Sequence, residues 1–175
     1  MSNLVIGNIL CFVAATIMTL MGLIKDRVKF LEAQSVMNAV YIAAYAFLGG
    51  VSGVIVNAIT MTRNIVCLKW KMTMPLKLIF ISVQVGLAVY FGTHGFVAWF
   101  PVIACSIFTW FMDTDDIVLL KYVIIGTQLL FLAYDWYVKG YAAVPFDILA
   151  TATNTLSLVQ LIKAKRAETE EEKGV

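Results

Sequence analysis

The chain has 175 residues and a formal net charge of +2, with 61% hydrophobic and 14% charged residues. Its mean hydropathy is +0.88. Soluble domains carry roughly 45–50% apolar and about 25% charged residues, so this composition excludes an ordinary soluble domain and indicates an integral membrane protein. A membrane-spanning helix needs about 20 mostly apolar residues, which gives the chain room for six or seven.

Seven apolar segments follow one another along the chain and predict seven transmembrane helices in an all-α fold. The first segment is long enough to span and has no basic region before it, so we expect a spanning helix rather than a removable signal peptide. Glycines such as Gly49 and Gly50 separate neighbouring segments. The predicted spans cover residues 4–24, 30–48, 51–68, 78–91, 96–112, 117–137 and 142–162.

Basic residues are distributed unevenly between the two sets of span ends. With seven spans, Lys139 alone falls on one side, and the remaining 12 of the 13 Lys and Arg residues fall on the other. Cytoplasmic loops of membrane proteins carry an excess of basic residues. The sequence therefore predicts an N-terminus outside the membrane and a C-terminus in the cytoplasm.

A shift of 90 positions aligns the first three spans with the last three. It pairs Asn64 with Asn154 and Gly50 with Gly140. Both triplets then run in the same direction, which predicts two parallel three-helix repeats related by an axis along the membrane normal. The predicted units are repeat 1 at residues 1–72, a linker helix at 73–94, repeat 2 at 95–163 and a charged cytoplasmic tail at 164–175.

This 3+1+3 arrangement resembles the SWEET sugar facilitators and the PnuC vitamin transporters. In contrast to SWEET proteins, the chain has no Pro-Gln pair at the start of a repeat. Several short motifs lie along the spans: Asn57-Ala58-Ile59, Pro101-Val102-Ile103, Thr109-Trp110, Trp136 with Gly140, and the region of Asn154. On these residues the whole chain resembles the YgjV-type bacterial inner membrane proteins more closely, and this likeness implies a location in the cell inner (cytoplasmic) membrane.

Polar residues share one face of the third and seventh spans. Asp147, Thr151 and Asn154 are spaced i, i+4 and i+7, and Asn57 and Asn64 occupy the corresponding positions 90 residues earlier. In repeat transporters the binding site lies near the membrane midplane at the repeat interface, so these five residues are predicted to bind solute. The alternative for the amides is hydrogen bonding between helices.

Asp147 and Arg63 are charges within predicted spans. A charge at such a depth costs at least about 2.5 kcal/mol unless it faces protein or water. Asp147 is therefore a candidate for binding a cation or hydroxyl, or for proton coupling. It could instead pair with Lys139 at the interface or cap the helix that follows Pro145. Arg63 is predicted to snorkel to the cytoplasmic interface rather than to bind an anion.

The second and sixth spans contribute further candidates. Asn38 and Gln128 correspond under the shift of 90, as do Tyr45 and Asp135. Amides, a phenol and a carboxylate suit a hydroxylated, mostly neutral solute. Aromatic side chains could stack on a ring of such a solute, although a place in the membrane-interface belt is the alternative for each tryptophan. These aromatic candidates are Tyr134, Trp136 and Trp110.

Several classes of site are not indicated. Cys11, Cys67 and Cys105 have no paired spacing, and His94 has no metal-binding neighbours, so neither a disulfide nor a metal site is expected. The sequence contains no nucleotide-binding or nucleophile motif. We expect no cofactor and no enzymatic activity. Topology and anionic lipid explain the basic ends, so nucleic-acid binding is not expected.

The sequence thus favours a small-molecule membrane transporter, either a facilitator or proton-coupled. Its solute would be polar and hydroxylated, such as a sugar, nucleoside or vitamin, and it would move by alternating access. The alternative is a non-transporting membrane subunit or interaction protein whose polar stripes only mediate helix packing. A membrane-embedded enzyme is the third hypothesis, for which the chain lacks an acid-base constellation. The short fourth span could support a homodimer.

Overall fold

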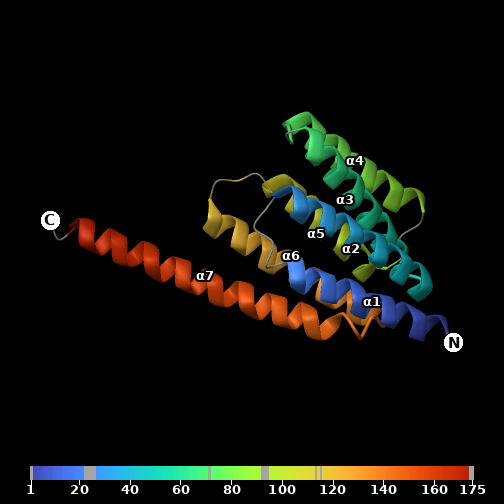
Figure 1. Ribbon diagram of the computed structural model, residues 1–175. Helices are drawn as coiled ribbons and strands as arrows, with labels where there is room; N and C mark the ends of the chain where they lie inside the picture. Colours follow the sequence, from blue (N-terminus) through green and yellow to red (C-terminus); the bar gives the residue numbers. More distant parts are fainter. Residues whose placement is uncertain are drawn as a thin grey trace.

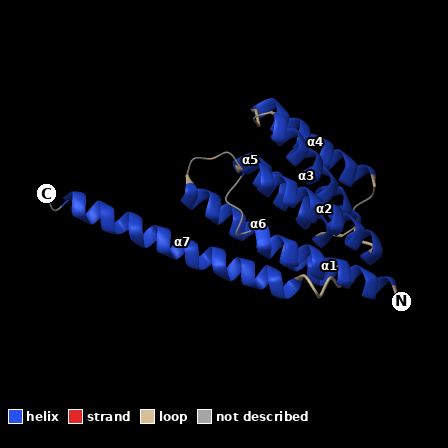
Figure 2. Cartoon of the chain, viewed as in Figure 1, coloured by secondary structure: helices blue, strands red, loops and turns tan. Residues whose placement is uncertain are grey.

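The protein is a bundle of α-helices in the computed structural model, which describes residues 2–21, 27–70, 72–91, 95–112, 114 and 116–173 (Figure 1). Within these residues there are seven α-helices, one short 3-10 helix and no strand (Figure 2). The helices are α1 (Asn3–Met21), α2 (Arg27–Leu48), α3 (Val51–Lys69), α4 (Met74–Tyr90), η1 (Val97–Trp99), α5 (Phe100–Phe111), α6 (Ile117–Tyr137) and α7 (Val144–Lys173).

Each predicted span corresponds to one of the seven α-helices, with differences at several ends. Helix α2 begins three residues earlier than predicted, and α5 begins later, at Phe100, because η1 precedes it. Helix α4 begins at Met74, earlier than expected, because Pro75 occupies the first turn, where its missing N–H breaks no helical hydrogen bond. Helix α7 continues to Lys173 through the predicted tail, which is rich in strong helix formers. Residues 22–24 of the first predicted span and 92–94 of the linker lie outside the described residues.

The α2–α3 and α6–α7 connections have the same backbone arrangement. The Gly50 N–H donates to the Tyr45 carbonyl at 2.8 Å, and the Gly140 N–H donates to the Asp135 carbonyl at 2.8 Å. The residue before each glycine has a positive φ, 75° at Gly49 and 61° at Lys139. Such left-handed residues commonly close helix C-termini. We call this end of the bundle, with Gly50 and Gly140, the glycine end, and the opposite end the basic end.

Helices pack in sequence order. Helix α2 lies between α1 and α3, and α6 lies between α5 and α7. The two groups meet where α3 contacts α5 and where α1 contacts α7. In Figure 1 α3 and α4 form the upper edge, and α7 runs along the lower edge. Gly53 has no Cβ atom, which lets α3 pack closely against Tyr45 of α2. A Cβ atom added at Gly53 would lie only 2.7 Å from the Tyr45 ring.

Buried polar side chains fix α4 to α5. Gln84 is 2% exposed and donates to the Val102 carbonyl at 2.8 Å and to the Ser106 hydroxyl at 3.1 Å. Lys77 is also buried and donates to the Trp110 carbonyl at 3.0 Å. The helix that the sequence identifies as a linker is therefore anchored to the second group of helices.

Among the described residues, three helices can cross a membrane by length and composition: Asn3–Met21, Val51–Lys69 and Val118–Tyr137. Met74–Tyr90 and Val97–Phe111 are apolar but shorter. Large apolar side chains on several helices point away from the bundle, which suits a lipid environment because helices satisfy their own backbone groups there. Examples of these exposed residues are Phe12, Leu20, Ile79, Val89, Leu149 and Leu156.

Candidate binding cavity

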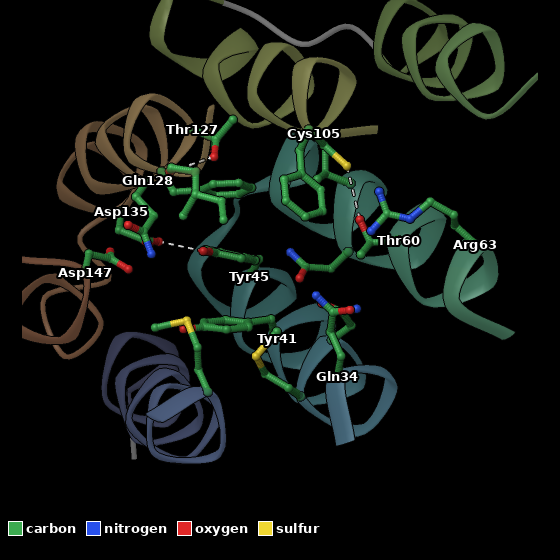
Figure 3. A pocket seen from close by; sticks show the side chains of 18 residues that line it. Gln34, Tyr41, Tyr45, Thr60, Arg63, Cys105, Thr127, Gln128, Asp135 and Asp147 are labelled. Atoms are coloured by element: carbon green, nitrogen blue, oxygen red, sulfur yellow. Dashed lines mark hydrogen bonds between the residues drawn. The ribbon is translucent and has the colours of Figure 1, made fainter. Parts of the chain in front are cut away.

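A cavity of about 230 Å³ lies inside the bundle. Helices α2, α3, α5 and α6 form most of its wall, and α1 and α7 contribute one residue each. Figure 3 shows that side chains from both groups of helices point into it. Its polar and charged lining residues are Gln34, Asn38, Tyr41, Tyr45, Asn57, Thr60, Arg63, Thr127, Gln128, Asp135 and Asp147.

Two carboxyl groups lie on one side of the cavity. Asp135 is 2% exposed and accepts a hydrogen bond of 2.7 Å from the Tyr45 hydroxyl. Asp147 is 8% exposed, lies against the Asp135 carboxyl, and has a buried Oδ2 atom without a partner (Figure 3). Within the described part of the chain, no basic side chain contacts either group. Two adjacent ionised carboxylates repel each other in a buried site, so the pair requires a proton or another cation.

Aromatic rings pack beside this carboxyl pair. The Tyr41 and Tyr45 rings are stacked, with centroids 5.6 Å apart and an interplanar angle of 14°. Tyr134 meets Tyr45 edge to face, and its hydroxyl accepts a 2.9 Å hydrogen bond from the Gly53 N–H. Tyr41 and Tyr45 line the cavity, whereas Tyr134 lies outside the lining and packs against the Tyr45 ring.

Arg63 lies on the opposite side of the cavity from Asp147 (Figure 3). Its side chain is 2% exposed, and Nη1 donates to the Thr109 hydroxyl at 2.8 Å. The guanidinium carbon lies 5.6 Å from the centroid of the Phe108 ring, and Nε is buried without a partner. The prediction that Arg63 snorkels to the interface is wrong, because two α5 side chains hold the guanidinium inside the bundle.

The predicted polar stripes divide between the cavity and the helix contacts. Asn38, Asn57, Gln128 and Asp147 line the cavity. Asn57 Nδ2 donates to the Gly53 carbonyl at 2.8 Å, and Asn38 Nδ2 is buried without a partner. The amides of Asn38 and Asn57 can therefore meet a bound molecule.

Asn64 and Asn154 lie outside the cavity lining and bond to neighbouring helices. Asn64 donates to Gln34 Oε1 at 2.9 Å, and Asn154 donates to Gln128 Oε1 at 3.3 Å and accepts from Lys121 at 2.9 Å. Each asparagine thus orients an amide that lines the cavity. Thr151 also lies outside the lining, although its Oγ1 atom is buried without a partner.

The two predicted tryptophans lie away from the cavity. Trp110 is 41% exposed and Trp136 is 65% exposed. Trp136 packs edge to face against Tyr141 with ring centroids 5.7 Å apart. Neither indole is placed to stack on a molecule in the cavity, because each is exposed on the outside of the bundle and lies outside the cavity lining.

Sequence reasoning named Asn38, Tyr45, Gln128 and Asp135 but missed Gln34, Tyr41 and Thr127 among the polar lining residues, and a helical pattern could have found the first two. Gln34, Asn38, Tyr41 and Tyr45 are spaced i, i+4, i+7 and i+11, which places them on one face of α2. On α6 the lining residues Ile124, Gln128, Phe131 and Asp135 have the same spacing. Thr60 carries a weaker signal, because its contact is the Cys105 sulfur at 3.2 Å on a helix distant in sequence.

Hydrogen bonds close the bundle at the glycine end. Asn8 of α1 donates to the Lys139 carbonyl at 3.1 Å and accepts from the Ala142 N–H at 2.9 Å. Tyr45 and Asp135 join α2 to α6 at the same end.

The site favours binding of a polar molecule. The described residues include no group of three or more side chains suited to hold a metal ion.

A family model described as a bacterial inner membrane protein, Imp-YgjV, matches residues 5–165. Comparison with curated proteins and with solved structures found no match. The match spans nearly the whole chain, and the helices are apolar and outwardly hydrophobic. The chain therefore belongs to the Imp-YgjV family of bacterial inner membrane proteins.

Proposed function

We propose that this membrane protein is a transporter that moves a small polar solute through its central cavity by alternating access. The observation that carries the proposal is the set of unsatisfied polar atoms around the cavity: Asn38 Nδ2, Arg63 Nε and Asp147 Oδ2. Polar groups buried within a membrane bundle are costly unless paired, and nearly all native ones have partners. A bound solute would supply the missing partners.

Likenesses between the two groups of helices support this proposal. The glycine turns of α2–α3 and α6–α7 share their hydrogen bond and their positive φ values. Tyr45 and Asp135, exactly 90 positions apart, are hydrogen-bonded to each other. Residues related by a twofold axis contact each other only close to that axis. We therefore propose that the axis of two repeats would pass close to this pair, beside the cavity, where repeat transporters bind their solutes.

The charge distribution gives the proposed orientation. All seven helices would span, with the glycine end outside and the basic end in the cytoplasm. The hydrogen bonds of Asn8 and Tyr45 would then form the outer gate. In this state the solute would enter or leave toward the cytoplasm, and transport would require these bonds to break.

Asp147 is the proposed proton carrier if transport is coupled to a proton gradient. The titratable groups around it are Asp135 of α6, Tyr41 of α2 and Cys11 of α1. Asp147→Asn should abolish the dependence of uptake on a pH gradient, because asparagine binds no proton at this site. The measurement is uptake with and without a gradient in reconstituted vesicles. Unchanged coupling in the variant would contradict the assignment.

The transport proposal itself is tested with the purified protein in liposomes. Sugars, nucleosides, vitamins, amino acids and amines would be screened for a rise in thermal stability, since a ligand at a hundredfold excess over its Kd stabilises the folded state by about 2.7 kcal/mol. Each hit would be followed as uptake by protein-containing and protein-free liposomes. Binding without uptake, or no binding across the screen, would contradict transport.

A second candidate is a membrane subunit that binds another protein. The bonds of Asn64 to Gln34 and of Asn154 to Gln128 favour it, because they show polar residues joining helices within one group. Such bonds contribute about 0.6 kcal/mol on average in membranes. A stable partner recovered from the native membrane, together with a failed liposome assay, would favour this function.

A further inference from the structure

The carboxyl side of the cavity indicates the chemical class of the solute. We infer that the solute is an organic cation, whose ammonium group binds to Asp135 and Asp147 beside the rings of Tyr41 and Tyr45. This inference rests on the proposed transport function and narrows its solute from polar molecules in general to amines.

Charge is the first argument. Asp135 and Asp147 are both at least nine-tenths buried and lie against each other. No basic side chain among the described residues compensates them. Buried charges are normally paired, and removing the partner of a buried charge is strongly destabilising. With a neutral sugar the pair would have to retain a proton, whereas a positively charged amine would neutralise the ionised pair.

Hydrogen-bonding capacity is the second argument. The Tyr45 hydroxyl occupies one oxygen of Asp135, whereas Asp147 Oδ2 has no partner. A primary ammonium group has three donors and no acceptor, and therefore matches a group of free acceptor oxygens.

The aromatic wall is the third argument. Tyr41 and Tyr45 stack beside the carboxyl pair and line the cavity. A cation within about 6 Å of an aromatic centroid gains favourable interaction with the ring face, and the gain is larger when water is excluded. A hard metal cation would require six or more oxygen ligands, whereas an ammonium group with an organic body uses both the carboxylates and the rings.

Arg63 gives the cavity a polarity that orients such a solute. Its guanidinium lies across the cavity from Asp147 and has no carboxylate partner among the described residues (Figure 3). Like charges repel, so the ammonium group is driven away from Arg63 and toward the carboxyl pair. The organic body then lies among Asn38, Asn57 and Gln128.

The test compares primary amines with alcohols of the same carbon chain, in which a hydroxyl replaces the ammonium group. Binding to the detergent-purified full chain would be measured by calorimetry and thermal unfolding, in sodium and in potassium buffer. We expect amines to bind at least about tenfold more tightly than the matching alcohols, in line with the worth of a charged hydrogen bond. Asp135→Asn and Asp147→Asn should each remove this preference. Glu32→Gln, the same change at an exposed position of α2, should retain it.

The possible outcomes separate this inference from the transport proposal. Alcohols or sugars that bind and are transported as well as amines would overturn the amine assignment and leave transport standing. Stabilisation by sodium but not by amines would also overturn it. If no compound binds or crosses the membrane, both proposals fail. The comparison of amine with alcohol uses the unaltered protein, so it decides the question even if an aspartate variant does not fold.

Discussion

The contact of α3 with α5 and the contact of α1 with α7 join the same two groups of helices, but they differ in their bonds. Along the first, Thr60 contacts Cys105 and Arg63 donates to Thr109, so polar contacts reach toward the basic end. Along the second, Phe12 meets Phe146 near the glycine end, and no hydrogen bond among the described residues joins the two helices.

This difference suggests which part of the bundle moves. Regions with few buried contacts open at lower free-energy cost than well-bonded ones. The α1–α7 contact should therefore separate first, while the α3–α5 contact acts as a hinge. Under the proposed pseudo-symmetry, the α3–α5 contact corresponds to the α1–α7 contact. Alternating access requires that, in any one state, one of these contacts is tighter than the other, and this is the difference seen here.

Replacement of Arg63 by methionine should produce the largest effect, because it removes the charge that links α3 to α5. We expect transport to fall by about tenfold or more, the worth of a charged hydrogen bond. Thermal stability should stay the same or rise, because an apolar side chain often replaces a buried charge without loss.

Uptake and melting temperature measured on the same preparation of the Arg63→Met variant check this prediction. Thr62→Val is the matched control, since the Thr62 hydroxyl is exposed and bonds only to the Ala58 carbonyl of its own helix. A strongly destabilised Arg63→Met protein would show that Arg63 is a packing residue of the α3–α5 contact.

Sequence reasoning located the helices better than the site because helices depend on local pattern. The apolar runs and the glycines at 49 and 50 are visible in sequence, and α2 and α3 end and begin there. The depth of Arg63 depends on Thr109 and Phe108, which approach it only after α5 packs on α3. Tryptophan is a residue type common in binding sites, but Trp110 and Trp136 face outward because of how each helix is rotated in the bundle, which the sequence does not show.

An intermediate effect is expected from Asn8→Ala, which removes the two hydrogen bonds between α1 and the α6–α7 connection. A loss of about 1 kcal/mol would raise the population opened at the glycine end by about fivefold. Cys11, fully buried one turn further along α1, is the reporter. Its labelling by a membrane-impermeant thiol reagent should accelerate by that factor.

The labelling experiment requires Cys67 and Cys105 to be replaced by serine, so that Cys11 is the single thiol. Thr16→Ala is the control on the same helix, because the Thr16 hydroxyl bonds only to the Phe12 carbonyl. Equal labelling rates in both variants would mean that Asn8 does not hold the glycine end closed.

The smallest effect is expected from Asn154→Leu, which tests whether α7 contributes to the site beyond Asp147. Asn154 bonds to Gln128 and Lys121 of α6 and does not line the cavity. Leucine has the same number of side-chain heavy atoms and the same branching at Cγ, so the expected loss is about the 0.6 kcal/mol of an average polar contact in a membrane bundle. Without Asn154 the Gln128 amide is no longer held in place at the cavity, and a loss of this size corresponds to about a threefold loss of ligand affinity.

Calorimetry on this variant and on Asn64→Leu, which frees Gln34 in the same way, gives the comparison. If Asn154→Leu abolished binding while the protein remained folded, the basic half of α7 would have to move into the cavity during transport. The open contact between α1 and α7 would then be the path of that movement.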